Sequence, residues 1–287
     1  MSIEIVRRLA DLRSVVGGWR RQDLVTAVVP TMGALHAGHI SLVQAALARA
    51  DRVVVTIFVN PKQFNAATDL ANYPRTEAGD IAKLQACGAH LLYAPAVEEI
   101  YPPGFATTVS VAGVSQGLCG AFRPGHFDGV ATVVAKLLLQ TGADLALFGE
   151  KDFQQVKVIE RMVRDLDIPI EIVPCPTVRE ADGLALSSRN LRLSAAERAV
   201  APRLAAILVA TADRLAVGAA VATTLAAASA EIIAAGFRSV DYLELRAASD
   251  LQQHAELDRP ARLLVAAWLG ETRLIDNLEV TRRGVGI

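Results

Sequence analysis

Two histidines three positions apart belong to a segment that could bind phosphate. His36 and His39 stand in the run Pro30-Thr-Met-Gly-Ala-Leu-His-Ala-Gly-His39, which follows an apolar stretch and precedes residues with helical spacing. A helix start offers free backbone N–H groups and the positive end of the helix dipole, so imidazoles there can help to hold a triphosphate. The pattern is neither the Walker loop nor the Rossmann glycine fingerprint. The alternative interpretation is a helix cap with two incidental histidines.

A charged turn follows a later apolar run, in Phe148-Gly-Glu-Lys-Asp-Phe-Gln-Gln155. Lys151 can place a point charge on triphosphate oxygens, and either Glu150 or Asp152 could bind Mg²⁺. Acidic residues at a helix start also complement the helix dipole, but a lysine there is electrostatically unfavourable. We therefore expect this turn to face a ligand.

A third polar segment, Gly183-Leu-Ala-Leu-Ser-Ser-Arg-Asn190, joins two hydroxyl groups to a guanidinium. The planar fork of Arg189 suits phosphate oxygens, and the adjacent hydroxyls could complete a clamp. A polar loop whose serines cap a helix is the alternative.

Gln63 lies in the segment Phe58–Phe64, a turn at the end of another apolar run. Asn60 precedes a proline, which favours an extended or turning backbone that can aim the Gln63 amide at a hydroxyl or carboxylate. A routine turn at a strand end is the alternative. In the glycine-rich loop 120–129, Arg123 and His126 could reach a ligand or simply stabilise the loop, and Tyr73–Thr76 is interpreted as a structural turn.

Short apolar runs and helical patterns alternate through the first part of the chain. The strand candidates are Leu24–Val29, Val53–Val59, Leu91–Tyr93, Leu145–Phe148 and Ile170–Val173. The helix candidates are Ile40–Arg49, Thr76–Cys87, Gly129–Gln140 and Phe153–Leu166. This alternation predicts an α/β fold with a doubly wound, Rossmann-like parallel sheet. Ligands bind such sheets at the carboxyl ends of the strands, where the polar segments lie.

The composition changes after about Pro176. An alanine-rich helical stretch, 195–235, is broken at Val217-Gly218, and strand candidates follow at 240–245, 263–269 and 273–277. The last two form a predicted hairpin. We therefore expect a domain of residues 1–176 and a second, smaller α+β domain of residues 177–287.

Composition limits the partners and the compartment. The 287 residues carry 29 basic and 30 acidic side chains, a balance that disfavours nucleic acid as a partner. Cys87, Cys119 and Cys175 are far apart in the sequence and indicate free thiols. The N-terminus lacks a signal-peptide core, and the alanine-rich tract 215–230 is too weakly hydrophobic to span a membrane. We expect a cytoplasmic protein that makes no membrane contact.

Taken together, these segments resemble the pantoate–β-alanine ligase (pantothenate synthetase) family, within the nucleotidyltransferase and class I synthetase superfamily. The resemblance spans essentially the whole chain, and the ordered set is far more specific than any one motif. The matching stretches are Val29–His39, Phe58–Phe64, Arg123–Phe127, Phe148–Gln155, Gly183–Asn190, Val265–Gly270 and Arg273–Asn277.

The resemblance implies a two-step reaction in a homodimer. The carboxylate of pantoate attacks the α-phosphorus of Mg·ATP to give pantoyl adenylate and pyrophosphate. The amine of β-alanine then attacks the activated carbonyl, which releases AMP and pantothenate. ATP is thus a substrate and Mg²⁺ the implied cofactor.

The resemblance also implies roles for individual residues. His39 is the expected proton donor, and His36, Lys151 and Arg189 are the other expected catalytic residues. Gln63 and Gln155 would bind pantoate, with Gln63 also near β-alanine, and Asp152 would hold Mg²⁺. The expected ATP contacts are Met32, Gly33, Ala34, Leu35, His36, Ala37, Gly38, His39, Gly149, Glu150, Lys151, Asp152, Val178, Leu186, Ser187, Ser188 and Arg189.

Two departures and two alternatives accompany the resemblance. Lys62 stands where many family members carry Met, and the 186–190 loop lacks the paired lysines of the synthetases' Lys-Met-Ser-Lys-Ser loop, which leaves that work to Arg189.

A nucleotidyltransferase acting on a small phosphate ester would explain the histidines but not Gln63 and Gln155. A non-enzymatic nucleotide-binding protein would not need His39 and Lys151 together.

Overall fold

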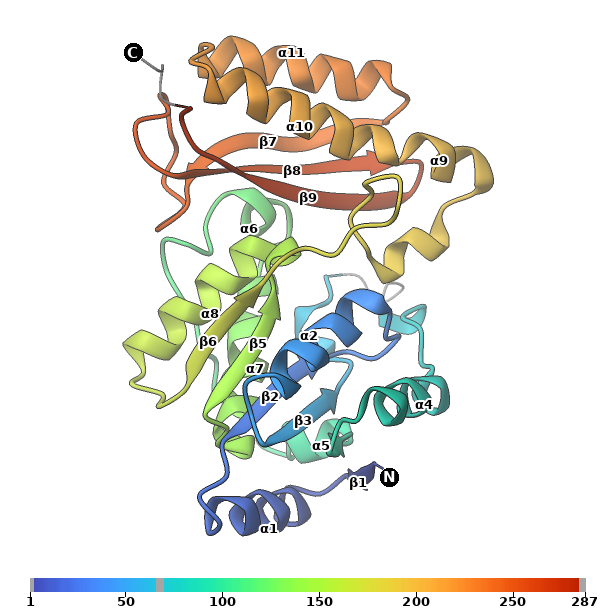
Figure 1. Cartoon of the computed structure of the whole chain (residues 1–287), viewed down its shortest axis with the longest axis vertical. Helices are drawn as coiled ribbons and strands as arrows, with labels where there is room; N and C mark the ends of the chain where they lie inside the picture. Colours follow the sequence, from blue (N-terminus) through green and yellow to red (C-terminus); the bar gives the residue numbers. More distant parts are fainter. Residues whose placement is uncertain (1–2, 66–69, 284–287) are drawn as a thin grey trace.

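The computed structural model describes residues 3–65 and 70–283, and its N-terminal part is built on a parallel sheet (Figure 1). Within the described residues this sheet has six strands in the order β1-β4-β3-β2-β5-β6, all parallel. The strands are β1 Glu4–Val6, β2 Thr26–Thr31, β3 Arg52–Ile57, β4 Leu91–Tyr93, β5 Leu145–Gly149 and β6 Glu171–Cys175.

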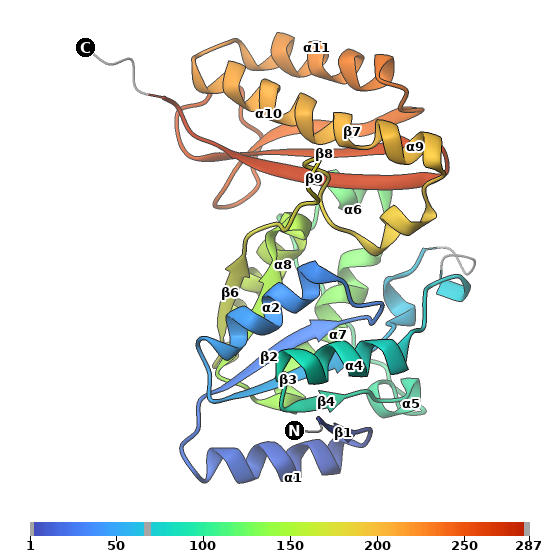
Figure 2. The ribbon, with the colours of Figure 1, turned by 45° about the vertical axis from the view of Figure 1, so that its right-hand side comes forward.

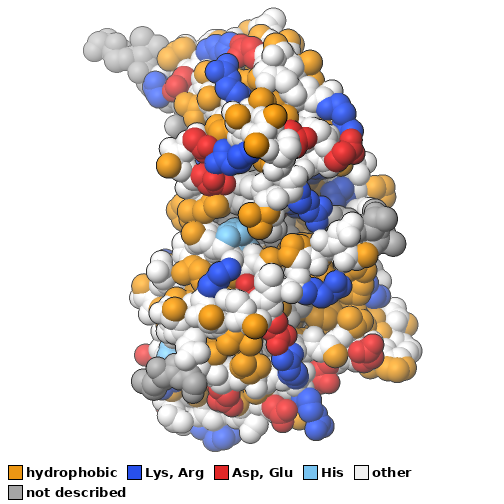
Figure 3. Space-filling model, turned by 90° about the vertical axis from the view of Figure 1, so that its right-hand side faces the viewer, with side chains coloured by type: hydrophobic (Ala, Val, Ile, Leu, Met, Phe, Trp, Pro, Cys, Tyr) orange, Lys and Arg blue, Asp and Glu red, His pale blue; other side chains and the backbone are white. Residues whose placement is uncertain are grey.

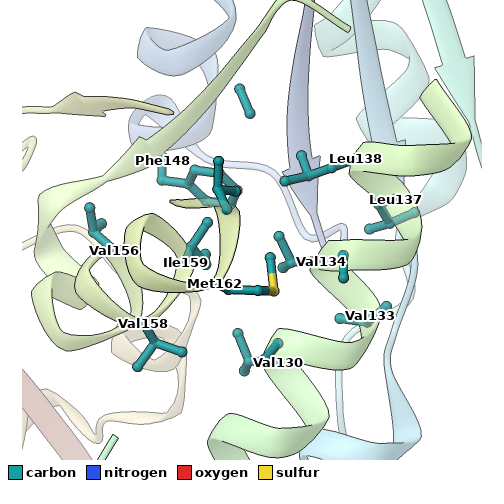
Figure 4. Close-up of a cluster of buried hydrophobic side chains, with 14 of the residues drawn as sticks. Val130, Val133, Val134, Leu137, Leu138, Phe148, Val156, Val158, Ile159 and Met162 are labelled. Atoms are coloured by element: carbon teal, nitrogen blue, oxygen red, sulfur yellow. The ribbon is translucent and has the colours of Figure 1, made fainter. Parts of the chain in front are cut away.

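Helices cover both faces of this sheet, so its central strands are mostly apolar. In β2, Ala27 and Val29 join the core beneath α2 and α4, whereas Val28 joins the opposite core beneath α1, α7 and α8. Figure 4 shows the second core, where apolar side chains of α7 and α8 meet beside Phe148. The helices are α1 Leu9–Arg20, α2 Ala37–Leu47, α4 Glu77–Cys87, α5 Val97–Ile100, α6 Leu118–Phe122, α7 His126–Thr141 and α8 Phe153–Asp165.

The C-terminal part is an antiparallel sheet in the order β7-β8-β9, with α10 and α11 on its outer face (Figure 2). Its inner face packs on the N-terminal part, because Leu264 and Ala266 join the core of α7 and α8, whereas Leu263 and Val265 pack under α10 and α11. The elements are α9 Ala195–Val200, α10 Pro202–Ala216, α11 Val221–Ala234, β7 Ser239–Ala247, β8 Ala261–Leu269 and β9 Thr272–Val280.

The doubly wound parallel sheet and the smaller C-terminal α+β part are therefore as predicted, including the hairpin of β8 and β9 and the helix break at Val217-Gly218. The sequence did not predict β1 and α1. β1 has three residues, of which Glu4 and Ile5 are exposed, so it leaves no recognisable pattern. No helix in the described part of the chain is long and apolar enough to cross a membrane.

Candidate active site

A cavity of about 240 Å³ lies where the winding of the parallel sheet reverses, next to β2 and β5. The segment with His36 and His39 follows β2, and the turn with Lys151 follows β5. A histidine side chain is visible in the hollow between the two parts of the molecule in Figure 3. The predicted site residues that line the cavity are Met32, His36, Gly38, His39, Gln63, Gly149, Lys151, Asp152, Gln155, Val178, Leu186, Ser187, Ser188 and Arg189.

The backbone between β2 and α2 turns through a left-handed conformation that one buried carboxylate stabilises. Gly33 has φ +81° and Ala34 has φ +51°, an unusual value for a residue with a side chain. Asp80 of α4 is fully buried and accepts the backbone N–H groups of Ala34 and Leu35, both at 2.8 Å. Asp80 thus fixes the turn that leads to the histidines, from a position that no motif marks.

The two histidines form a reciprocal cap on α2. His36 is the N-cap, and its Nδ1 accepts the backbone N–H of Gly38 at 3.2 Å, while Nδ1 of His39 accepts the backbone N–H of His36 at 3.3 Å. Because each Nδ1 is an acceptor, each neutral ring carries its proton on Nε2. The histidines therefore form the helix cap themselves, and the cap leaves two Nε2–H donors for the site.

The surroundings of both rings favour the neutral form. Burial lowers the pKa of His39 to about 3, with a further contribution from His36. Burial also lowers the pKa of His36, assisted by the positive charges of Lys151 and Lys83. The rings can therefore donate hydrogen bonds to phosphate, whereas the fixed cations of the site are lysine and arginine.

The amide of Gln63 is held in one orientation. Buried Asn60 donates through Nδ2 to Gln63 Oε1 (3.0 Å) and to the Gly129 carbonyl (3.0 Å), and its Oδ1 accepts from Tyr101 (2.8 Å). The oxygen of Gln63 is thereby occupied, and its NH₂ group faces the cavity beside the Met32 sulfur. Gln63 thus presents donors suited to a hydroxyl or carboxylate oxygen.

Arg123 and His126 form a second buried network next to Gln63. His126 donates through Nδ1 to the Gln63 carbonyl (2.9 Å), so its Nε2 accepts from Arg123 (3.1 Å). Burial lowers the pKa of His126 to about 4, helped by the charge of Arg123. Both side chains line the cavity. The sequence left open whether Arg123 and His126 reach a ligand or stabilise their loop. In the structure they contact the neighbouring loop and also face the cavity.

The turn after β5 brings Lys151 and Asp152 into the cavity, with Nζ and Oδ2 3.7 Å apart. Desolvation disfavours the charged form of Asp152, but Lys151 and Arg189 outweigh it and hold the pKa of this carboxyl below its usual range. Glu150 instead pairs with Arg262 of β8 at 3.1 Å. Its carboxylate therefore ties the two parts of the molecule together, and the ATP contact expected for Glu150 stays a prediction.

The loop that carries Arg189 belongs structurally to the C-terminal sheet. Arg179, at the base of this loop, makes a bidentate ion pair with Asp276 of β9 at 2.7 and 2.9 Å. Ser187 caps the short helix η3, Ser188–Arg192, by accepting the N–H of Arg189 at 3.2 Å. The Tyr73 hydroxyl bonds Ser188 and Tyr73 lines the cavity, although the sequence indicated only a turn there.

A larger cavity of about 650 Å³ opens between the parallel sheet and β7–β9. It continues the first one, because Arg123, Lys151, Gln155 and Arg189 line both. Gln155 therefore faces the shared space. Its neighbour Gln154 is buried and bonds the backbone at Val114 and Cys119, which is a structural role.

Some expected ATP contacts act from outside the cavity. Gly33, Ala34, Leu35 and Ala37 are not among its lining residues in the described part of the chain; they shape the turn that carries the histidines. Residues that sequence reasoning missed are Asp80 and Asn277. Asn277 belongs to the stretch Arg273–Asn277 that resembles the family. Only its contacts to the Lys151 turn, described below, connect it with the site.

A cluster of His, Cys, Asp or Glu side chains able to enclose a metal ion by itself is absent from the described residues. Mg²⁺ usually takes one or two carboxylates and completes its shell with substrate phosphates and water. Asp152, ionised and on the cavity wall, fits that requirement as a single protein ligand.

Comparison with known proteins agrees with this geometry. A family model described as pantoate-beta-alanine ligase matches residues 4–279. The pantothenate synthetase of Chelativorans sp. (strain BNC1) is 67% identical, with 98% of this chain and 99% of that protein covered. The crystal structure of the pantothenate synthetase from Thermus thermophilus superposes with a TM-score of 0.90 at 46% identity, over 97% of this chain and 100% of that one.

A further crystal structure is of pantoate-beta-alanine ligase from Francisella tularensis, complexed with beta-gamma ATP and beta-alanine. It superposes with a TM-score of 0.82 at 34% identity, over 96% of this chain and 97% of that one. The left-handed turn, the histidine cap, the oriented Gln63 and the Lys151 turn thus occur in a chain that matches these proteins along nearly its whole length. This chain belongs to the pantoate–β-alanine ligase family of enzymes.

Proposed function

We propose that this enzyme makes pantothenate in two steps through a pantoyl adenylate. Pantoate binds at Gln63 and Gln155, its carboxylate attacks the α-phosphorus of ATP, and pyrophosphate leaves. The amine of β-alanine then attacks the acyl carbon beside Gln63, and AMP leaves. The chemistry of the first step needs no strong base, because a carboxylate is already a nucleophile at neutral pH.

One observation carries the proposal: the carboxyl ends of β2 and β5 bring two kinds of donors into one cavity. The Nε2–H groups of His36 and His39 come from one side, and the ammonium of Lys151 comes from the other. Attack at phosphorus builds negative charge on oxygen, and preorganised donors stabilise that charge without reorganising. In this scheme the neutral His39 ring donates a hydrogen bond from its Nε2–H to a phosphate oxygen and keeps its proton, and Arg189 adds a cation.

Asp152 is the residue that would hold Mg²⁺, together with phosphate oxygens of ATP. The ion would neutralise phosphate charge as the leaving pyrophosphate forms. We further propose that residues 177–287 close over the ATP site as one domain, which would protect the acyl adenylate from water. The Arg179–Asp276 ion pair supports this, because it attaches the Arg189 loop to the C-terminal sheet. Homodimerisation stays a prediction from the resemblance, and a cytoplasmic location stays a prediction from the sequence.

The purified protein is tested with ATP, Mg²⁺, pantoate and β-alanine, and AMP is monitored. AMP should form in multiple turnovers only when both organic substrates are present, and chelation of Mg²⁺ should stop it. Quenched single turnovers without β-alanine should contain enzyme-bound pantoyl adenylate and free pyrophosphate. Folded protein that makes no AMP with both substrates would contradict the ligase activity. If the protein makes pantothenate with both substrates but the quenched single turnovers contain no adenylate, the ligase activity stands and only the adenylate intermediate is contradicted.

A further inference from the structure

Within the matching stretch Arg273–Asn277, two adjacent residues of β9 contact both cation-bearing segments of the site. We propose that Asn277 is a positioning residue for the ligase reaction. Its amide fixes the turn that carries Lys151, and its neighbour Asp276 fixes the loop that carries Arg189, which sets the spacing of the two cations across the phosphate site. The inference rests on the proposed function, in which these cations contact ATP.

The Asn277 contact is a paired one. Asn277 is 3% exposed, and its Nδ2 donates to the backbone carbonyls of Glu150 at 2.8 Å and Lys151 at 2.9 Å. Both donor hydrogens are thus used on two successive residues of one short turn. A turn held at two neighbouring carbonyls cannot rotate freely, so the direction in which Lys151 leaves it is constrained.

In the described part of the chain, the Asn277 side chain makes hydrogen bonds only to the Lys151 turn. Its Oδ1 is buried and has no hydrogen-bond partner among the described residues. A buried polar atom without a partner costs free energy. The unpaired oxygen of Asn277 is therefore a cost that comes with the amide. What the amide adds is the pair of bonds to the Lys151 turn.

The neighbouring residue holds the other cation. Asp276 is 4% exposed and pairs with Arg179, which also donates to the Asn277 carbonyl at 3.4 Å. Arg179 begins the loop whose far side carries Arg189. The adjacent residues Asp276 and Asn277 therefore connect the Lys151 turn to the loop that carries Arg189. This connection sets the distance between the two cations.

The test is a double-mutant cycle on single-turnover adenylate formation, measured with ATP and pantoate by rapid quench. Asn277→Leu keeps the number and branching of the side-chain heavy atoms and removes the donors. It should slow adenylate formation by about 10- to 100-fold in the native background, as expected for misplacing one electrostatic group. In a Lys151→Met background the same change should cost less than about 3-fold, because Asn277 acts through Lys151. The KM for pantoate should not change.

Arg262→Met is the matched control. It breaks the other link between the same sheet and the same turn, the Glu150 ion pair, but leaves the carbonyl contacts of Asn277. Its effect should be the same factor in both backgrounds. Thermal unfolding checks that each variant folds; if Asn277→Leu does not, Asn277→Ser, which cannot bond both carbonyls, takes its place with the same expectation.

Two results would overturn the inference. An Asn277 variant that forms adenylate at the native rate shows that Lys151 needs no such support. Equal losses in both backgrounds show that Asn277 only stabilises the fold. In both cases native protein that makes AMP leaves the proposed function intact, whereas native protein that makes none overturns both.

Discussion

The rings of His36 and His39 lie with their centroids 4.1 Å apart at the start of α2, and each Nδ1 accepts a backbone N–H. The same bonds that cap the helix thus decide which nitrogen of each ring carries the proton. Both Nε2–H groups are left for a ligand, next to the positive end of the helix dipole. Helix capping and phosphate binding are here one arrangement.

Removing one of these donors should slow the first chemical step. His39→Ala or Lys151→Ala should reduce the single-turnover rate of adenylate formation by at least about 100-fold, comparable to the loss of one oxyanion donor. The second step should change less, because the intermediate is then already activated. His254→Gln, outside both cavities, is the control and should retain the native rate. Near-normal rates in both variants would disprove the assigned roles.

Stability should depend on pH through the buried histidines. The pKa of His39 falls from 6.5 to about 3 on folding, so between these values the unfolded chain binds a proton that the folded protein does not. The free energy of unfolding should therefore fall as the pH drops from about 7 to 5, by up to about 1.4 kcal/mol per pH unit for each such group.

Urea unfolding at several pH values measures this dependence. His39→Gln should make it shallower, and so should His126→Gln, because the pKa of His126 is likewise lowered, to about 4. An NMR titration of the His39 ring with a midpoint near 6.5 would be inconsistent with a buried neutral imidazole.

A methyl group at position 38 should displace the His36 ring. A Cβ on Gly38 would lie 3.0 Å from both Cε1 and Nδ1 of His36, closer than such contacts normally are. Gly38→Ala should raise the KM for ATP by roughly 10-fold, since a misplaced donor costs about the energy of one hydrogen bond. Gly79→Ala is the control: its Cβ would meet nothing within 4 Å on α4, and alanine favours helix. Equal KM values in the two variants would contradict the prediction.

Replacing the Gln63 donors by a carboxylate should impair pantoate binding selectively. In Gln63→Glu, Asn60 still holds one oxygen, and the other faces the acid in place of an NH₂ group. The KM for pantoate should rise by at least about 10-fold through repulsion, and the KM for ATP should change less. Gln22→Glu adds the same charge in the exposed turn after α1 and controls for net charge. A pantoate KM that stays native in Gln63→Glu would remove this glutamine from the acid's site.

The elements that the sequence predicted well are those with a local signature. Strands buried on both faces are continuous apolar runs, so β2, β3 and β5 were recognisable, and the amphipathic pattern marked α8. Boundaries shifted where side chains cap the ends: α2 begins at Ala37 because His36 caps it, before the apolar spacing starts. The short edge strand β1 depends on pairing with β4 and was missed.

The sequence alone determined the α/β class, the family, and the polar segments at the strand ends that make the site. These follow from short-range patterns and from ordered motifs. Only the tertiary structure decided the strand order, the protonated nitrogen of each histidine, and the partners Asp80 and Asn277. Such partners are separated from their targets by as many as 127 positions, and a bond across that distance leaves no periodicity. The tertiary structure also shows the ion pair of Glu150 with Arg262, which can form only when the two sheets lie close together.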